Sequence, residues 1–200
     1  LDLIRALIKI QCEVKTILTK GGAEFVTPLS IASLSKNKVY SDMYSVENES
    51  EMDHISLSRW SDLILIAPAT SNIIAKMSQG ISDDLATTVV QASNKCIFVC
   101  PAMNVRMWEH VSNKQNLEKI KSYNYRIIGP FNGEMACGEY GDGRMADIKY
   151  ILNELDNFFK SKSNNKKFKA IVTAGPTREY IDPVRYICLL YTSDAADDWS

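Results

Sequence analysis

Two continuous apolar runs in the middle of the chain predict buried strands. They are DLILIA at residues 62–67 and CIFVC at residues 96–100, and both are typical of parallel strands that helices cover on both faces. Apolar residues that recur every three to four positions predict helices at residues 1–10, 71–77, 84–93, 111–123 and 147–159. Shorter strands are expected at residues 13–18 and 125–128, and residues 23–34 are expected to be helical in part. Strands that alternate with helices indicate an α/β domain built around a parallel sheet.

Two stretches interrupt this pattern. Residues 37–53 are polar and carry an acidic run, which is typical of a solvated loop. Residues 161–167 (SKSNNKK) lack apolar anchors and are typical of a linker. A further strand is expected at residues 168–173, where it leads into a turn, and the apolar patterning ends near residue 188.

Composition narrows the class of protein. With 46% hydrophobic and 24% charged residues, the 200-residue chain has the make-up of a packed soluble protein and not of a disordered one. The net charge of −1 provides no field that attracts nucleic acid or an anionic membrane. The apolar runs are far shorter than the ~20 residues of a membrane span, and no signal peptide opens the chain. Five cysteines without a CxxC pair favour reduced thiols in a cytoplasmic protein and offer no zinc site.

Small and polar residues follow three of the expected strands. The segments are TKGG at residues 19–22, PATSN at residues 68–72 and PAMN at residues 101–104. Because open parallel sheets bind ligands outside the carboxyl ends of their strands, these segments are candidate ligand contacts. Thr70 and Ser71 also begin a helix, where open N–H groups favour an anion such as phosphate. Helix capping alone is the alternative explanation for each segment, and the pattern does not name the ligand.

His54 and Cys137 are candidate proton carriers. His54 begins an expected helix, and imidazole side chains exchange protons near neutral pH, although a capping or surface role is the alternative. Cys137 lies in GEMACGEYGDGR at residues 133–144, which holds four of the nine glycines of the chain. This density predicts a mobile flap that carries an acid to a substrate, with an ordinary exposed loop as the alternative. Cys96 and Cys100 alternate along a buried strand and are expected to be inert.

Four motifs, in this order, resemble the flavin-dependent cysteine decarboxylases. They are His54-Ile55-Ser56-Leu57-Ser58-Arg59-Trp60-Ser61-Asp62, Ala67-Pro68-Ala69-Thr70-Ser71-Asn72, Pro101-Ala102-Met103-Asn104 with Met107, and Ala136-Cys137-Gly138 through Gly143-Arg144-Met145. Within that family they are most similar to the phosphopantothenoylcysteine decarboxylases of coenzyme A biosynthesis, over about residues 1–160. Residues 172–179 and 181–187 look like the opening of a phosphopantothenate–cysteine ligase domain, which is commonly fused behind the decarboxylase in bacteria.

The resemblance implies a flavodoxin-like or Rossmann-like three-layer α/β fold and an FMN-dependent enzyme. That enzyme would convert 4′-phosphopantothenoylcysteine to 4′-phosphopantetheine by oxidation of the thiol, loss of CO2 and re-reduction. In the family the flavin sites are shared between subunits, so a cytoplasmic homo-oligomer, a trimer or dodecamer, is expected, without nucleic acid or membrane partners. Mg2+ and CTP belong only to the ligase domain, and no metal is expected in the decarboxylase.

Carried over by motif, three residues have catalytic roles. His54 would be the active-site base near the thiol, Asn104 would bind the substrate carboxylate, and Cys137 would protonate the decarboxylated intermediate. The expected cofactor-binding residues are Thr19, Lys20, Gly21, Thr70, Ser71, Asn72, Ile73 and Ala102. The expected substrate-binding residues are Asn104, Met107, Glu134, Met135 and Ala136.

The resemblance also implies a division of the chain. Residues 1–160 would be the decarboxylase domain, residues 161–167 the linker, residues 168–187 the start of the ligase domain, and residues 188–200, where the family pattern ends, a non-native tail. The family's first strand and its glycine-rich turn would precede Leu1. Weak FMN binding or incomplete folding is therefore expected for the chain as written, and no ligase activity is expected.

Two other functions stay open. One is a decarboxylase of the same family that acts on the carboxyl-terminal cysteine of a peptide, and the ligase-like segment disfavours it. The other is a flavoprotein-like regulatory subunit without catalysis. The joint presence of His54, Asn104 and Cys137 disfavours this second alternative, because a binding subunit needs none of that chemistry.

Overall fold

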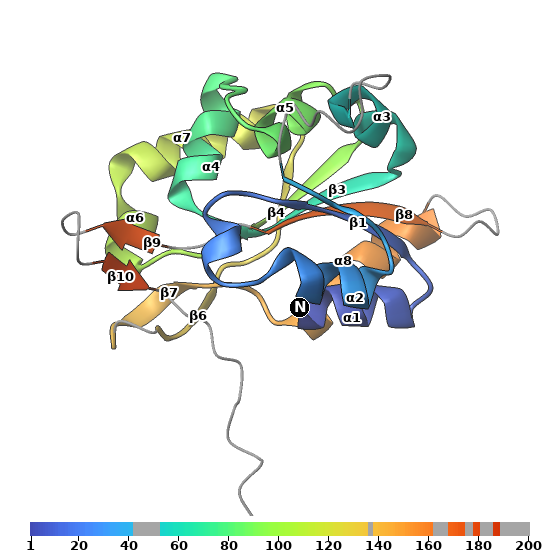
Figure 1. The fold of residues 1–200 in the computed structure, drawn as a ribbon. Helices are drawn as coiled ribbons and strands as arrows, with labels where there is room; N and C mark the ends of the chain where they lie inside the picture. Colours follow the sequence, from blue (N-terminus) through green and yellow to red (C-terminus); the bar gives the residue numbers. More distant parts are fainter. Residues whose placement is uncertain (42–52, 136–137, 162–167, 175–177, 181–185, 189–200) are drawn as a thin grey trace, which may run out of the picture.

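The computed structural model describes residues 1–41, 53–135, 138–161, 168–174, 178–180 and 186–188 (Figure 1). The helices are α1 (Asp2–Lys9), η1 (Gly22–Glu24), α2 (Pro28–Ser35), α3 (Asp53–Trp60), α4 (Ser71–Gln79), α5 (Leu85–Gln91), α6 (Val105–Glu109), α7 (Val111–Ser122) and α8 (Ile148–Ser161). The strands are β1 (Glu13–Leu18), β2 (Val39–Tyr40), β3 (Leu63–Ala69), β4 (Cys96–Pro101), β5 (Arg126–Ile127), β6 (Phe131–Glu134), β7 (Tyr140–Arg144), β8 (Lys169–Ala174), β9 (Arg178–Tyr180) and β10 (Tyr186–Cys188).

Six strands form one parallel sheet in the order β2-β1-β8-β3-β4-β5. Helices α1, α2 and α8 cover one face of this sheet, and α3, α4, α5 and α7 cover the other (Figure 1). The two remaining pairs, β6 with β7 and β9 with β10, are antiparallel. The expected three-layer α/β fold with a parallel sheet is therefore confirmed.

Each face of the sheet has its own apolar core, because neighbouring residues along a strand point to opposite faces. On β3, Leu63 and Leu65 face the core that α1, α2 and α8 cover, whereas Ile64 and Ile66 face the core of α3, α4, α5 and α7. All four side chains are fully buried. This double burial is the reason that β3 has the continuous apolar sequence from which the strand was predicted.

Capping residues set the starts of the helices that follow the strands. The Thr27 side chain accepts a hydrogen bond from the Ser30 N–H, so that Pro28 occupies the first turn of α2, where its missing N–H costs nothing. Asp84 and Thr87 form a reciprocal capping box at the start of α5. Gly80 ends α4 in the left-handed conformation, which favours glycine.

The largest local difference from the sequence-based expectation concerns residues 133–144. Their glycines predicted a mobile flap; the described part of the segment forms the antiparallel hairpin of β6 and β7, and the mobility of this hairpin stays a prediction. Gly133 and Gly141 are paired across this hairpin. Glycine within a strand often marks a place where another backbone approaches closely. The pattern also missed the two-residue strand β2, which pairs with β1.

The strand expected at residues 168–173 forms as β8, and its position is the main topological finding. It lies between β1 and β3, in the interior of the six-stranded sheet (Figure 1). The expected division of the chain into domains stays a prediction. Among the described residues, no helix is long and apolar enough to cross a membrane.

Candidate functional site

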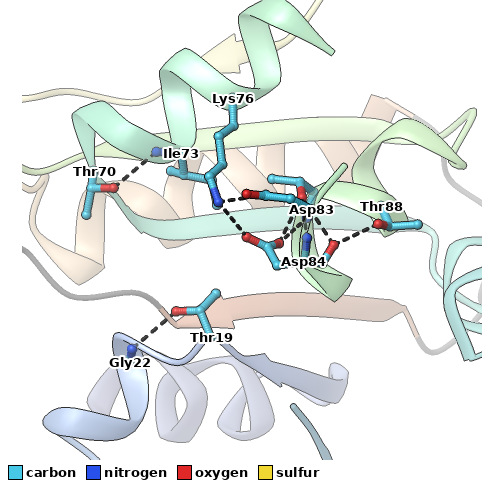
Figure 2. Close-up of polar contacts among 9 residues, drawn as sticks. Thr19, Gly22, Thr70, Ile73, Lys76, Asp83, Asp84 and Thr88 are labelled. Carbon is cyan, nitrogen blue, oxygen red and sulfur yellow. Dashed lines mark hydrogen bonds and ion pairs between the residues drawn. The ribbon is translucent and has the colours of Figure 1, made fainter. Parts of the chain in front are cut away.

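The carboxyl ends of β1, β8, β3 and β4 lie side by side at one edge of the sheet, because these strands are parallel neighbours. The segments that sequence analysis selected after β1, β3 and β4 therefore leave the sheet at the same edge. Figure 2 shows the turns at Thr19 and Thr70 at this end of the molecule, on either side of β8. Ligands of open α/β sheets bind in this place.

The turn after β1 is closed by Thr19. Its hydroxyl accepts a hydrogen bond from the Gly22 N–H at 3.2 Å, and its carbonyl accepts one from the Ala23 N–H at 3.0 Å (Figure 2). These bonds fold the chain directly into η1. Lys20 is exposed and Gly21 is half-buried at the edge of the sheet, so both can reach a ligand there.

Thr70 caps the amino terminus of α4. Its hydroxyl accepts from the Ile73 N–H at 3.2 Å, and its carbonyl accepts from the Ile74 N–H at 3.1 Å (Figure 2). The cap is thus confirmed for Thr70, and the contact of this turn with a cofactor stays a prediction. The N–H groups of Ser71 and Asn72 belong to the first turn of the helix, where they and the helix dipole favour an anion.

Asn104 caps the short helix α6 at the end of β4. Its side-chain oxygen accepts from the Met107 N–H at 2.7 Å, and its carbonyl accepts from the Trp108 N–H at 2.9 Å. The amide oxygen of Asn104 is thus occupied by the cap, and its NH2 group is the part that can donate a hydrogen bond to a ligand such as a carboxylate. Asn104 and Met107 are both half-buried. Ala102 is fully buried, and its N–H donates to the Ala69 carbonyl at 2.9 Å, which links the ends of β4 and β3.

The β6–β7 hairpin is attached next to Asn104. The Met103 N–H donates to the Gly143 carbonyl at 3.0 Å. A Cβ on Gly143 would lie 2.2 Å from the Met103 carbonyl oxygen, so only glycine permits this approach. On the same hairpin Glu134 is exposed and Met135 is buried, whereas Ala136 and Cys137 lie outside the described residues. Of the predicted substrate-binding residues, Glu134 ends β6 and Met135 follows it, so both belong to a segment that is attached to the chain next to Asn104.

His54 is the second residue of α3 and is half-buried. The helix precedes β3 and packs against the sheet through Leu57. None of the interactions found among the described residues joins His54 to Thr70 or Asn104. Its assignment as the active-site base therefore stays a prediction.

Sequence reasoning missed a charged cluster between α4 and α5, formed by Lys76, Asp83 and Asp84. The Lys76 ammonium contacts the Asp83 carboxylate at 2.7 Å and the Asp84 carboxylate at 3.2 Å (Figure 2). Burial alone would raise the pKa of Asp84, but hydrogen bonds from Thr87 and Lys76 outweigh it and lower this pKa. Burial likewise acts to lower the pKa of Lys76, and the bonds to both aspartates outweigh it and raise this pKa. The sequence signal that could have revealed this cluster is the pair Asp83-Asp84, which follows shortly after Gly80, the glycine at the end of the helix that carries Lys76.

Two cysteines are excluded as nucleophiles by their surroundings. Burial raises the pKa of Cys12 to about 11 and that of Cys100 to about 12. Both thiols are therefore protonated at neutral pH, and the thiolate is the reactive form.

The groups at the sheet edge fit a phosphate-bearing flavin. Hydroxyls of Thr19 and Ser71, helix N–H groups of α4 and the amide of Asn72 are donors of the kind that bind phosphate. Gly21, which has no side chain and is half-buried at this edge, keeps the backbone open to a flat ring system.

Comparison with known families and curated proteins agrees with this site. The flavoprotein family profile matches residues 1–160, and the profile described as the DNA/pantothenate metabolism flavoprotein C-terminal domain matches residues 165–190. Among the relatives is the coenzyme A biosynthesis bifunctional protein CoaBC of Haemophilus influenzae, 42% identical over 187 residues, which are 94% of this chain and 47% of that protein. The protein of the same name from Bacillus subtilis is 38% identical, over 90% of this chain and 45% of its own length. The chain thus spans about half the length of these curated relatives.

Solved structures give the same picture. A cysteine-to-serine mutant of PPC decarboxylase, complexed with pantothenoylaminoethenethiol, superposes with a TM-score of 0.65 at 26% identity and covers 79% of this chain and 93% of its own. The FMN binding protein AtHal3 has a TM-score of 0.64 at 28% identity, over 81% of this chain and 94% of its own. HAL3 from Cryptococcus neoformans has a TM-score of 0.71 at 26% identity, over 82% and 90%. With its family profile matched along residues 1–160 and its relatives about 40% identical, the chain belongs to the flavoprotein family.

Proposed function

We propose that the chain is an FMN-dependent decarboxylase that converts 4′-phosphopantothenoylcysteine to 4′-phosphopantetheine and CO2 in coenzyme A biosynthesis. The relatives named for coenzyme A biosynthesis and the PPC decarboxylase structure support this substrate. A cytoplasmic location accords with such a metabolic role. We assign no ligase activity, and no use of Mg2+ or CTP, to these 200 residues.

The observation that carries the proposal is the position of Asn104. Its amide stands at the carboxyl end of β4, with the oxygen held by the Met107 N–H and the NH2 available as a donor. A neutral donor can hold a carboxylate without the fixed positive charge that would oppose its departure as CO2. A lysine or arginine in this place would stabilise the ground state of the substrate more than the transition state of decarboxylation.

The start of α4 would offer N–H donors to the FMN phosphate, in addition to the family's glycine-rich turn expected before Leu1, and Thr19, Lys20 and Gly21 would bind the cofactor from the neighbouring turn. Ser71, Asn72 and Ile73 provide the N–H groups of the first turn, and the small, fully buried Ala102 would support the site from behind at the end of β4. When bound, FMN would supply the two-electron oxidation of the substrate thiol to a thioaldehyde, which makes the adjacent C–C bond easy to break, and the same two electrons would return to the protonated product to give the thiol of phosphopantetheine.

The residues of the chain would transfer protons and bind the charged carboxylate. His54 accepts the proton of the substrate thiol, and Asn104 orients the carboxylate until it leaves as CO2. The electron pair of the broken bond gives an ene-thiolate, whose carbon takes a proton from Cys137. Glu134, Met135 and Ala136 would bind the substrate together with Met107 and Asn104.

A peptide with a carboxyl-terminal cysteine is the competing substrate. The match of residues 165–190 to the pantothenate-metabolism profile favours phosphopantothenoylcysteine, because this segment has no evident use in a peptide-modifying enzyme. The enzyme would act as a homo-oligomer, a trimer or dodecamer, that shares its flavin sites.

A substrate competition assay tests the proposal. The purified chain is loaded with FMN and given phosphopantothenoylcysteine and a short peptide ending in cysteine at equal concentration, and the products are measured by mass spectrometry. We expect phosphopantetheine and CO2 from the first compound and no loss of mass from the second. Decarboxylation of the peptide alone would assign the other substrate class, and absence of reaction with a fully flavin-loaded chain would contradict both.

A further inference from the structure

A basic hollow lies at the amino ends of β4 and β5. Its volume is about 760 Å³, and it is bounded by the connection from α5 to β4 on one side and by the end of α7 with its turn into β5 on the other. Because the strands are parallel, this edge of the sheet is opposite to the edge that carries Thr19, Thr70 and Asn104. The basic hollow is therefore separate from the candidate flavin site, and its size is that of a small-molecule pocket.

The charges that line the basic hollow have one sign. Lys95, Lys121 and Arg126 contribute three cationic groups, and none of the described residues that line it is an aspartate or a glutamate. The chain as a whole is balanced, with 23 basic and 24 acidic residues. Since a concave surface lined by one sign of charge concentrates the electric field, this local excess attracts anions although the whole chain does not.

Two of the cations have no carboxylate partner. Lys95 is half-buried, and none of the interactions found among the described residues engages its ammonium group. Its backbone N–H donates to the Ser93 hydroxyl at 3.0 Å, which fixes the turn that carries the lysine. The Arg126 guanidinium carbon lies 5.5 Å from the ring centroid of Phe98 and 5.1 Å from that of Phe158, and no carboxylate in the described part of the chain pairs with this arginine. Both cations are thus available to form charge-assisted hydrogen bonds with an anion.

A role at the end of a helix is the alternative explanation for Lys121, because lysines often complement the carboxyl terminus of a helix. The last carbonyls of α7 already have backbone partners, as in the hydrogen bond from the Tyr125 N–H to the Ile120 carbonyl at 3.2 Å. The Lys121 ammonium instead contacts the Glu118 carboxylate at 2.7 Å, and both groups are exposed, so that water weakens the pair. Lys121 can therefore exchange Glu118 for a more highly charged anion in the basic hollow.

An aromatic pair stands beside these cations. The rings of Tyr123 and Tyr125 meet edge to face with their centroids 5.9 Å apart. The Tyr123 hydroxyl donates to the Ser78 carbonyl at 3.1 Å, which holds the ring in place, and 43% of this residue stays exposed. A fixed, accessible ring next to cationic groups is an arrangement on which a nucleobase can stack while its phosphates bind the cations.

We propose that the basic hollow is a second ligand site of this chain and that it binds a nucleotide. Lys95, Lys121 and Arg126 bind the phosphates, and Tyr123 supports the base. The three cations match the charge of a nucleoside diphosphate, and the volume of about 760 Å³ leaves room for more than phosphate alone. Because the two sites lie at opposite edges of the sheet, the nucleotide and FMN bind without competing. The inference goes beyond the proposed function and does not depend on it.

Calorimetric titration of the whole 200-residue chain with ADP, in buffer without magnesium, tests the proposal. We expect one ADP per chain, an affinity that falls as the salt concentration rises, and the same affinity with and without saturating FMN. Inorganic pyrophosphate should bind more weakly than ADP, because it has no base to stack. Absence of ADP binding, or displacement of ADP by FMN, would overturn the proposal.

A matched pair of substitutions tests the charges. Lys95→Met keeps an unbranched stem and removes the ammonium group, so ADP should bind about tenfold more weakly. Lys114→Met is the control, because Lys114 is an exposed lysine of α7 outside the basic hollow and its loss changes the net charge equally. Thermal unfolding verifies that both variants are folded. Equal ADP affinities of the two variants would show that only the net charge acts, which rejects the site.

A second pair of substitutions tests the base. Tyr123→Leu removes the ring and should weaken ADP binding about tenfold without weakening pyrophosphate binding. Tyr123→Phe also loses the hydrogen bond to the Ser78 carbonyl but keeps the ring, so its ADP affinity should stay within about twofold of the unmodified chain. If Tyr123→Leu binds ADP as well as Tyr123→Phe does, the base does not lie on this ring and the assignment to a nucleotide is wrong.

The same titrations separate this inference from the proposed function. A chain that binds ADP through Lys95 but never binds FMN would refute the flavin function alone. A chain that binds FMN but not ADP would refute the nucleotide site alone.

Discussion

Asn104 uses the two halves of its amide for different purposes, and substitution can separate them. Asn104→Asp keeps an oxygen that caps α6, because aspartate is as good a capping residue as asparagine. It removes the NH2 donor and places a negative charge against the substrate carboxylate. We expect this variant to retain its thermal stability and to lose CO2 release by at least about 100-fold.

Asn104→Ala is the matched control, since it removes the cap as well as the donor. It should lose activity and also about 1 kcal/mol of unfolding free energy. Activity and denaturation midpoint are measured on both variants. Normal turnover by Asn104→Asp would show that the NH2 group does not hold the carboxylate.

The proposed acid role of Cys137 predicts a specific defect. Cys137→Ser has a hydroxyl that is far less acidic than a thiol, so protonation of the ene-thiolate should fail while the earlier steps proceed. We expect mass spectrometry to detect a decarboxylated product that is two hydrogens short of phosphopantetheine, with CO2 released in single-turnover amounts. Cys96→Ser, on a strand at the sheet interior, is the control and should give the normal product. Full multiple turnover by Cys137→Ser would reject the acid role.

The Asp84–Lys76 pair predicts a pH dependence of stability. The pKa of Asp84 in the folded chain lies below its ordinary value of 3.8. Its charged form therefore stabilises the fold above pH 3.8, and this contribution disappears as the pH falls through the folded-state pKa. Asp84→Asn should be less stable than the unmodified chain near neutral pH, and the difference should shrink as the pH falls below 3.8 and through the folded-state pKa. Urea unfolding of both chains from neutral pH to pH 2 measures it, and a difference that is constant with pH would contradict the assignment.

At the scale of elements, the β6–β7 hairpin depends on the contact between Gly143 and Met103. Gly143 has a φ of +150°, and an added Cβ would meet the Met103 carbonyl oxygen, a backbone atom that cannot move away easily. Gly143→Ala should cost at least about 2 kcal/mol and raise the KM for substrate, because the hairpin carries Glu134 and Met135. Gly138→Ala is the comparison: its φ is +78°, but nothing lies within 4 Å of the added Cβ, so the cost should be about 1 kcal/mol. Equal stability of the two variants in thermal unfolding would rule out the close contact.

Sequence patterns predicted most of the elements because each pattern is local. Helices α1, α4, α7 and α8 and strands β1, β3 and β4 have the periods that burial on one or two faces requires, and they formed within a few residues of their expected bounds. The edge where the site lies followed from the same reasoning, because parallel strands place their carboxyl ends together. Thr70 illustrates the limit: its cap was predictable from its type and position, but a ligand contact was not.

The remaining features arise from pairings between distant residues. The strand pattern of β8 was recognised, but its sequence, KAIVTA at residues 169–174, does not predict that β1 and β3 are its neighbours. The cluster of Lys76 with Asp83 and Asp84 forms because Gly80 turns the chain back on itself between α4 and α5. The glycines of β7 predicted a mobile flap, but they did not predict the pairing of β7 with β6 or the close contact of Gly143 with Met103.

At the scale of the whole molecule, ligand binding at the sheet edge should stabilise the fold as a unit. At an FMN concentration 100 times its Kd, the free energy of unfolding should rise by about 2.7 kcal/mol. For a chain of this size, this corresponds to a rise in Tm of roughly 5–10 °C. Riboflavin, which lacks the phosphate, should give a much smaller shift at the same concentration, because the α4 amino terminus would have no anion to bind. Equal shifts in differential scanning fluorimetry would place the phosphate away from α4.

The pairing of β8 also has a consequence for the surface of the described sheet. Because β8 bonds to β1 on one side and to β3 on the other, neither of these strands presents an open edge toward it. Open strand edges invite pairing with other chains, so this arrangement leaves the open edges of the six-stranded sheet at β2 and β5 alone, and both of these strands are only two residues long.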